Sequence, residues 1–98
     1  MNVTLGILAM LDAKPGKEEQ LAAFLQAGRA IALAEEGTVT WYAFKISDAR
    51  YGIFDTFETE QARTEHINGE IPKVLAAVAD DLLASQPSIQ PVEIIAVK

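Results

Sequence analysis

The sequence has no cysteine, a single histidine, and only eight lysines and arginines against 14 aspartates and glutamates. Without cysteine, the chain can form neither a disulfide nor a thiolate metal site. One histidine among scattered carboxylates also disfavours a metal centre. The net charge of −6, with its few basic residues dispersed, argues against nucleic acid, which requires clustered positive charge. We therefore expect no metal, no nucleic-acid partner and no contact with an anionic membrane.

Long hydrophobic runs are also missing. The most apolar segment, residues 3–11, is far shorter than the roughly 20 residues that cross a bilayer. No basic residues precede it, as they would in a signal peptide, so we expect a cytoplasmic protein. Half of the 98 residues are nevertheless hydrophobic, although a chain of this length buries only about 60–65% of its unfolded surface. The excess predicts a large internal pocket or an apolar face covered by another chain.

The pattern of apolar residues predicts the element order β-α-β-β-α-β within one domain, residues 1–98. Strands are expected over residues 3–11, 38–46, 51–58 and 92–97, with residues 85–91 as a linker. A helix is expected from Lys17 to the glycine at position 37, and the second helical region is broken in two, at 60–68 and from Pro72 onward. This order predicts an α+β, ferredoxin-like fold with a four-stranded antiparallel sheet.

Apolar side chains occupy both faces of the expected strands. Leu5 and Ile7 point one way on the first strand, whereas Leu8 and Met10 point the other way. Because the helices of this arrangement cover only one face, the other face requires a partner. We expect a homodimer formed through the sheet face, with the helices outside.

The two central strands form a predicted hairpin around a loop at residues 47–50. That loop length places Tyr42 opposite Asp55, and Trp41 and Tyr42 on opposite faces. A carboxylate in mid-strand is costly to bury alone. We therefore expect the Tyr42 hydroxyl, or an arginine of a partner subunit, to compensate Asp55, whose own role is either structural, at a dimer interface, or that of a catalytic acid or base.

Two other polar positions have both a functional and a structural interpretation. His66 is the obvious base because the pKa of histidine lies near neutrality, but it could equally pack a helix end against the sheet. Glu35 and Glu36 occupy a helix C-terminus, where the helix dipole disfavours negative charge. They are either solvated or lie beside a pocket or subunit interface.

Three segments, LDAKPGKEEQLAAFL, AEEGTVTWYAF and YGIFDTFETEQARTEH, are similar in order and spacing to the antibiotic biosynthesis monooxygenase (ABM) family. The resemblance implies a dimeric α+β barrel with an apolar pocket between the sheet and the helices of each subunit. Members include oxygenases of quinols and anthrones that use no metal or flavin, and haem-degrading enzymes. The chain departs from the usual Glu-Pro-Gly at residues 35–37, and has Asp55 where glutamate is frequent. Its only tryptophan, Trp41, is on a strand, which argues against haem degradation.

The leading hypothesis is a cofactor-independent monooxygenase that acts on a small aromatic or quinol-type compound. Such an enzyme needs a base, an apolar pocket that positions the substrate, and exclusion of water. We expect catalytic roles for His66 and Asp55, and substrate contacts from Trp41, Tyr42, Phe24, Phe54 and Asn68, although core packing also explains the aromatic residues. The alternatives are a non-catalytic small-molecule-binding or stress-related dimer, and another reaction, such as isomerisation, on the same scaffold. An enclosed cavity of a few hundred Å³ beside His66 would favour catalysis.

Overall fold

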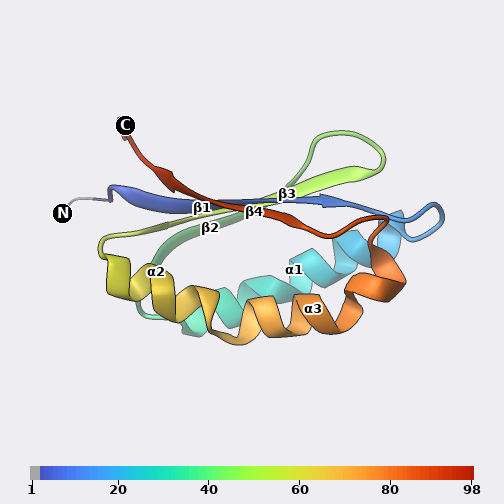
Figure 1. The fold of residues 1–98 in the computed structure, drawn as a ribbon, viewed down its shortest axis with the longest axis horizontal. Helices are drawn as coiled ribbons and strands as arrows, with labels where there is room; N and C mark the ends of the chain where they lie inside the picture. Colours follow the sequence, from blue (N-terminus) through green and yellow to red (C-terminus); the bar gives the residue numbers. More distant parts are fainter. Residues whose placement is uncertain (1–2) are drawn as a thin grey trace.

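The computed structural model describes residues 3–98 as one antiparallel sheet with all of its helices on one face (Figure 1). The strands lie in the order β2-β3-β1-β4. The elements are β1 (Leu5–Asp12), α1 (Glu18–Ala34), β2 (Thr38–Lys45), β3 (Arg50–Phe57), α2 (Glu60–Ile67), α3 (Glu70–Leu82) and β4 (Ser88–Glu93). The predicted ferredoxin-like α+β fold is confirmed.

The helix boundaries follow from local sequence signals. Two glutamates in the first turn of α1 favour its positive N-terminal end. The side chain of Thr59 caps α2 by accepting a hydrogen bond from the backbone nitrogen of Ala62 at 3.1 Å. Gly69 separates α2 from α3, and Pro72 lies within the first turn of α3. The predicted break in the second helical region is therefore confirmed. None of the helices over residues 3–98 is both long and apolar enough to cross a membrane.

The last strand was predicted too late in the chain. It covers Ser88–Glu93 instead of residues 92–97, so most of the expected linker is strand. Pro91 lies within this strand and pairs with Ile7. The strand tolerates proline because β4 is at the edge of the sheet, where a missing N–H needs no neighbour. Residues 94–98 continue without regular structure and leave the sheet (Figure 1).

The predicted hairpin register was also wrong, by one residue. Lys45 pairs with Tyr51, so the connection contains five residues instead of four. Trp41 therefore lies opposite Asp55, and Tyr42 lies opposite Phe54. Since successive side chains alternate between faces, Trp41 and Asp55 share one face of the sheet, and the Tyr42 hydroxyl is not the partner of Asp55.

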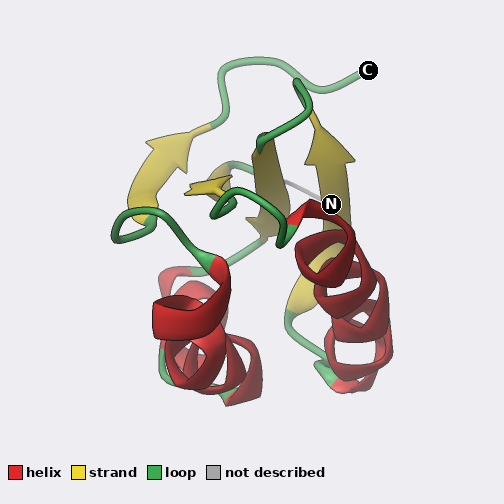
Figure 2. Ribbon diagram, turned by 90° about the vertical axis from the view of Figure 1, so that its right-hand side faces the viewer, coloured by secondary structure: helices red, strands yellow, loops and turns green. Residues whose placement is uncertain are grey.

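The hydrophobic core lies between the sheet and the helices. Leu11 of β1, Leu21 of α1 and Phe57 of β3 are fully buried there. Figure 2 shows the two layers end-on, with the helices below the sheet and, over residues 3–98, no helix above it. The uncovered side, here called the open face, carries half-buried and exposed apolar side chains, namely Leu8, Met10, Tyr42, Phe44, Phe54 and Val92.

Candidate functional site

His66 is held between two carboxylates on the helix side of the sheet. Its Nε2 lies 2.9 Å from Oδ2 of Asp55, and its Nδ1 lies 2.7 Å from Oε1 of Glu35. His66 is the buried residue of α2, Asp55 comes from the centre of β3, and Glu35 directly follows α1. The three side chains therefore tie together three elements that are distant in the sequence. We call this group the His66 bridge.

The His66 bridge favours the protonated imidazole. Burial by itself lowers the pKa of His66, but the hydrogen bonds to Asp55 and Glu35, together with their negative charges, raise it above 6.5 in total. The geometry has the same consequence. An ionised carboxylate only accepts hydrogen bonds, so both ring nitrogens can donate at once only when the ring carries two protons.

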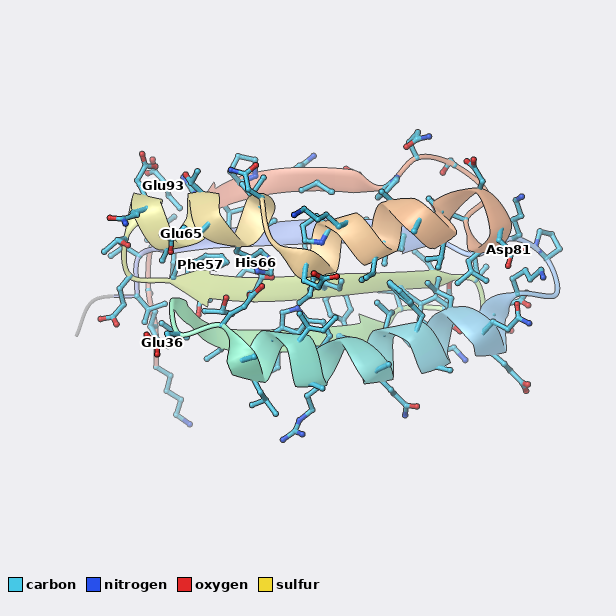
Figure 3. All side chains as sticks on the ribbon, turned by 90° about the horizontal axis from the view of Figure 1, so that it is seen from below. Glu36, Phe57, Glu65, His66, Asp81 and Glu93 are labelled. Atoms are coloured by element: carbon cyan, nitrogen blue, oxygen red, sulfur yellow. The ribbon has the colours of Figure 1, made fainter. Side chains whose placement is uncertain are left out.

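Neighbouring side chains fix the orientation of the bridge. Thr38 at the start of β2 donates its hydroxyl to Oε1 of Glu35 at 2.8 Å. The ring of Phe57 lies against the imidazole, with 5.3 Å between the ring centroids and an angle of 47° between the planes. Figure 3 shows His66 and Phe57 together between the helices. The imidazole is thus constrained on its face as well as at both nitrogens.

Two cavities of different character touch His66. The larger, about 390 Å³, lies between the end of α1, the start of β2, and the α2–α3 junction, and we call it the acidic cleft. Its lining includes Glu35, Glu36, Glu65, His66 and Glu70. The smaller, about 70 Å³, lies between the sheet, α2 and α3, and we call it the aliphatic cavity. Its lining includes Asp55 and His66 among isoleucine and leucine side chains.

Neither cavity alone has both the volume and the exclusion of water that the proposed catalysis requires. The acidic cleft has the few hundred Å³ expected of a ligand site, but Glu36, Glu65 and Glu70 are exposed, so its walls are wet. The aliphatic cavity excludes water better, yet is smaller than the roughly 150 Å³ that accommodates benzene. His66 and Asp55 are the titratable residues that line this smaller, more protected cavity.

Among the residues predicted to form a site, the structure brings His66 and Asp55 into direct contact. Trp41 lies beside Asp55 on the neighbouring strand, with its ring packed over Gly28 of α1. Phe24 packs, partly buried, against the core from α1.

The other predicted contacts lie elsewhere. Tyr42 and Phe54 form a cross-strand pair on the open face, and the Tyr42 side chain is 58% exposed. Asn68 is an exposed residue that ends α2. Of the described residues that line the two cavities touching His66, none is one of the five predicted substrate contacts, namely Trp41, Tyr42, Phe54, Asn68 and Phe24. Their substrate-binding roles remain predictions.

The sequence analysis gave a place beside a pocket as one of two interpretations of Glu35, and did not pair Glu35 with His66. The available signal was the pair of acidic residues at the end of α1, where the helix dipole is unfavourable to negative charge. Glu35 resolves that conflict by pairing with His66, which is 31 positions away, whereas Glu36 stays exposed. Thr38, which orients Glu35, gave no separate signal because threonine is common in strands.

Comparison with known proteins relates the chain to solved structures. No family model and no curated sequence matches it. The structure of NE2512, a protein of unknown function from Nitrosomonas europaea, superimposes with a TM-score of 0.95 at 43% sequence identity, covering 98% of this chain and 93% of that one.

More distant structures share the fold. PA3566 from Pseudomonas aeruginosa has a TM-score of 0.83 at 22% identity, covering 98% of both chains. A candidate antibiotic biosynthesis monooxygenase from Nitrosomonas europaea has a TM-score of 0.82 at 11% identity, covering 97% of this chain and 93% of that one. The chain therefore belongs to one family with NE2512, and its fold is that of the antibiotic biosynthesis monooxygenases.

Proposed function

We propose that the protein is a cofactor-independent monooxygenase that acts on a small aromatic or quinol-type compound. The observation that carries the proposal is the His66 bridge, which puts a titratable group with a shifted pKa beside an apolar cavity. Perturbed titratable groups in a cavity are typical of functional sites. The fold shared with a candidate antibiotic biosynthesis monooxygenase supports the same reaction class.

In this proposal, the chain's own residues handle a proton. Removal of a proton from the substrate gives an electron-rich anion, which can reduce dioxygen by one electron. One oxygen atom then replaces two hydrogens of the substrate and the other leaves as water, so the substrate supplies every electron. The unprotonated form of the His66 bridge accepts the proton, and Glu35 and Asp55 stabilise the resulting imidazolium.

Aerobic turnover of a panel of quinols and anthrones tests this function. Oxygen uptake by the parent is compared with that of His66→Ala and of Thr64→Ala, a change at an exposed position of the same helix. We expect uptake with at least one compound, no change in Thr64→Ala, and a loss of at least about 100-fold in His66→Ala after correction for the folded fraction measured by circular dichroism. The absence of uptake above background for every compound would contradict the oxygenase proposal, and full activity in His66→Ala would remove the base.

A second candidate function is a non-catalytic, small-molecule-binding dimer on the same scaffold. It is favoured by one observation, namely that both nitrogens of His66 already have carboxylate partners, as in a purely structural ion pair. Saturable binding of a panel compound without oxygen uptake would support this function over catalysis.

We also propose that two copies of the chain associate through their open faces. Leu8, Phe44 and Phe54 project from the side of the sheet opposite the helices, without cover from residues 3–98. Each 100 Å² of apolar surface removed from water contributes about 2.5 kcal/mol, so a shared sheet interface would be stable.

Sedimentation at micromolar concentration tests the dimer. Phe54→Asp places a charge in the centre of the open face and should yield monomers. Leu33→Asp is the matched control because Leu33 is 67% exposed on α1, on the other side of the molecule. A monomeric parent, or a Phe54→Asp variant that stays dimeric, would contradict this interface.

A further inference from the structure

One oxygen of the buried carboxylate in the site has no partner. Asp55 is 1% exposed, and its Oδ2 is bonded to His66. Its Oδ1 is buried and has no hydrogen-bond partner within residues 3–98. Among the described residues, Nε1 of Trp41, which lies opposite Asp55 on β2, is the other buried side-chain atom without a partner. Because buried polar atoms nearly always find a partner, Oδ1 of Asp55 is an acceptor for which a donor group of a ligand can compete.

The aliphatic cavity gives a ligand a route to this carboxylate. Asp55 and His66 form its polar end, and the remaining wall is hydrophobic, including Ile7, Ile53, Ile67, Ile71, Leu75 and Ile89. The side chains of Ile67 and Ile89 are 46% and 50% exposed. Two large apolar side chains that are half in water, on α2 and β4, mark an apolar approach from the surface to Asp55.

We infer that the aliphatic cavity binds the hydroxyl end of a small, neutral, apolar molecule, such as a phenol or a simple alcohol. The hydroxyl donates its hydrogen bond to Oδ1 of Asp55, and the hydrocarbon part rests against Ile67 and Ile89. This inference deepens the proposed function: it uses the same site and names Asp55 as the residue that contacts the substrate.

Charge and volume restrict the ligand further. An anion is repelled by Asp55 and Glu35, whose only close cationic partner among the described residues is His66. A cation would lose its hydration against the aliphatic wall. The volume of about 70 Å³ holds a hydroxyl and its nearest carbons, and is too small for a whole benzene ring. An aromatic ring must therefore extend through the mouth between Ile67 and Ile89.

Methyl NMR of isoleucine-labelled protein tests the site directly, under anaerobic conditions so that no turnover occurs. Five isoleucines line the cavity, whereas Ile46, Ile94 and Ile95 lie outside it and serve as internal controls. We expect phenol to shift the cavity methyls saturably. Toluene should bind at least about ten-fold more weakly because it cannot donate a hydrogen bond, and benzoate should not bind.

Two variants complete the test. Asp55→Asn removes the charged acceptor and should weaken phenol binding about ten-fold while leaving the weak binding of toluene unchanged. Ile89→Trp changes an exposed position at the mouth, so it should fold normally and block both ligands. Equal affinity for phenol and toluene, or no shift of the cavity methyls with any ligand, as when only water reaches Oδ1, would overturn the inference.

The result is separable from the oxygenase proposal. Phenol binding without oxygen uptake by any panel compound would support this site and contradict the reaction. Oxygen uptake that is unchanged in Asp55→Asn, with silent cavity methyls, would support the oxygenase reaction but contradict both this site and the proposed role of Asp55 in that reaction.

Discussion

Replacing His66 with leucine should remove a large part of the stability of this small protein. Leucine fills the space of the imidazole with an apolar side chain. It leaves Asp55, which is 1% exposed, without the cation bonded to its Oδ2. Breaking a buried ion pair from one side costs about 3–5 kcal/mol because the remaining charge is uncompensated. Native domains are stable by only about 5–15 kcal/mol, so the variant should be close to unfolding at neutral pH.

The loss should depend on pH in a defined direction. In the parent, burial lowers the pKa of His66, but the hydrogen bonds and charges of Asp55 and Glu35 raise it overall, and the leucine variant lacks this contribution. A group with a raised folded pKa contributes stability that is complete below its unfolded pKa and is lost as the pH rises through the folded pKa. The difference in the free energy of unfolding between parent and variant should therefore be largest below about pH 6.5 and smaller towards pH 9.

Urea unfolding at a fixed protein concentration, followed by circular dichroism, measures both effects. The matched control is the double variant Asp55→Leu with His66→Leu, which removes both charges. It should be more stable than His66→Leu alone, because no unpaired charge remains. A His66→Leu variant within about 0.5 kcal/mol of the parent at pH 7, an ordinary range for surface changes, would refute the view that His66 compensates Asp55.

Three further predictions concern the same fold. In the parent, the raised pKa of His66 contributes stability that is complete below pH 6.5 and is lost as the pH rises through the folded pKa. The free energy of unfolding should therefore fall from pH 6.5 to pH 9. A flat profile over this range would contradict this prediction. Thr59→Ala removes the cap of α2 and should cost about 1 kcal/mol, measured by urea unfolding against the exposed Thr64→Ala. Gly52→Ala would place a Cβ against the Phe44 ring on the open face, so Phe44 must move and the melting temperature should fall by an amount equivalent to about 1–3 kcal/mol. An unchanged melting temperature would contradict this packing.

The apolar periodicity was enough to predict the element order and the sheet, because each element must bury one face or stripe. Thr59 and Gly69 marked helix ends correctly, whereas α1 ends at Ala34 with Glu35 as its C-cap, two residues before the predicted Gly37. The predicted limits of the strands were less accurate where the apolar pattern did not determine where a strand begins. Residues 92–97 are the more apolar stretch, but β4 begins at Ser88 because backbone pairing with β1 determines its position.

The site was only partly predictable for a related reason. His66 and Asp55 stood out as the single histidine and a mid-strand acid, yet their contact depends on how α2 docks on β3. The hairpin loop is one residue longer than expected, which shifts the register so that Trp41, and not Tyr42, lies opposite Asp55. Glu35 joins the bridge through a tertiary contact across 31 positions, for which local sequence contains no direct signal.

The attachment of α2 explains why a joint between elements can also form a site. This helix has eight residues, too few to be stable alone, and His66 is its only buried residue. Polar contacts hold it instead: the His66 bridge at one end, and Arg63, whose Nη1 donates to the carbonyl oxygens of Gly6 and Val92 at 3.3 and 3.2 Å.

Gly69 permits the bridge from the other side of the joint. A Cβ at this position would lie 3.1 Å from the carbonyl oxygen of Glu65 and 3.3 Å from Oε2 of Glu35. A larger residue would therefore press on the carboxylate that faces His66. Because α2 is anchored by charge more than by apolar burial, loss of the proton on His66 weakens the docking of the helix that carries Ile67. We therefore expect the protonation state of the His66 bridge to affect how firmly α2 packs beside the aliphatic cavity.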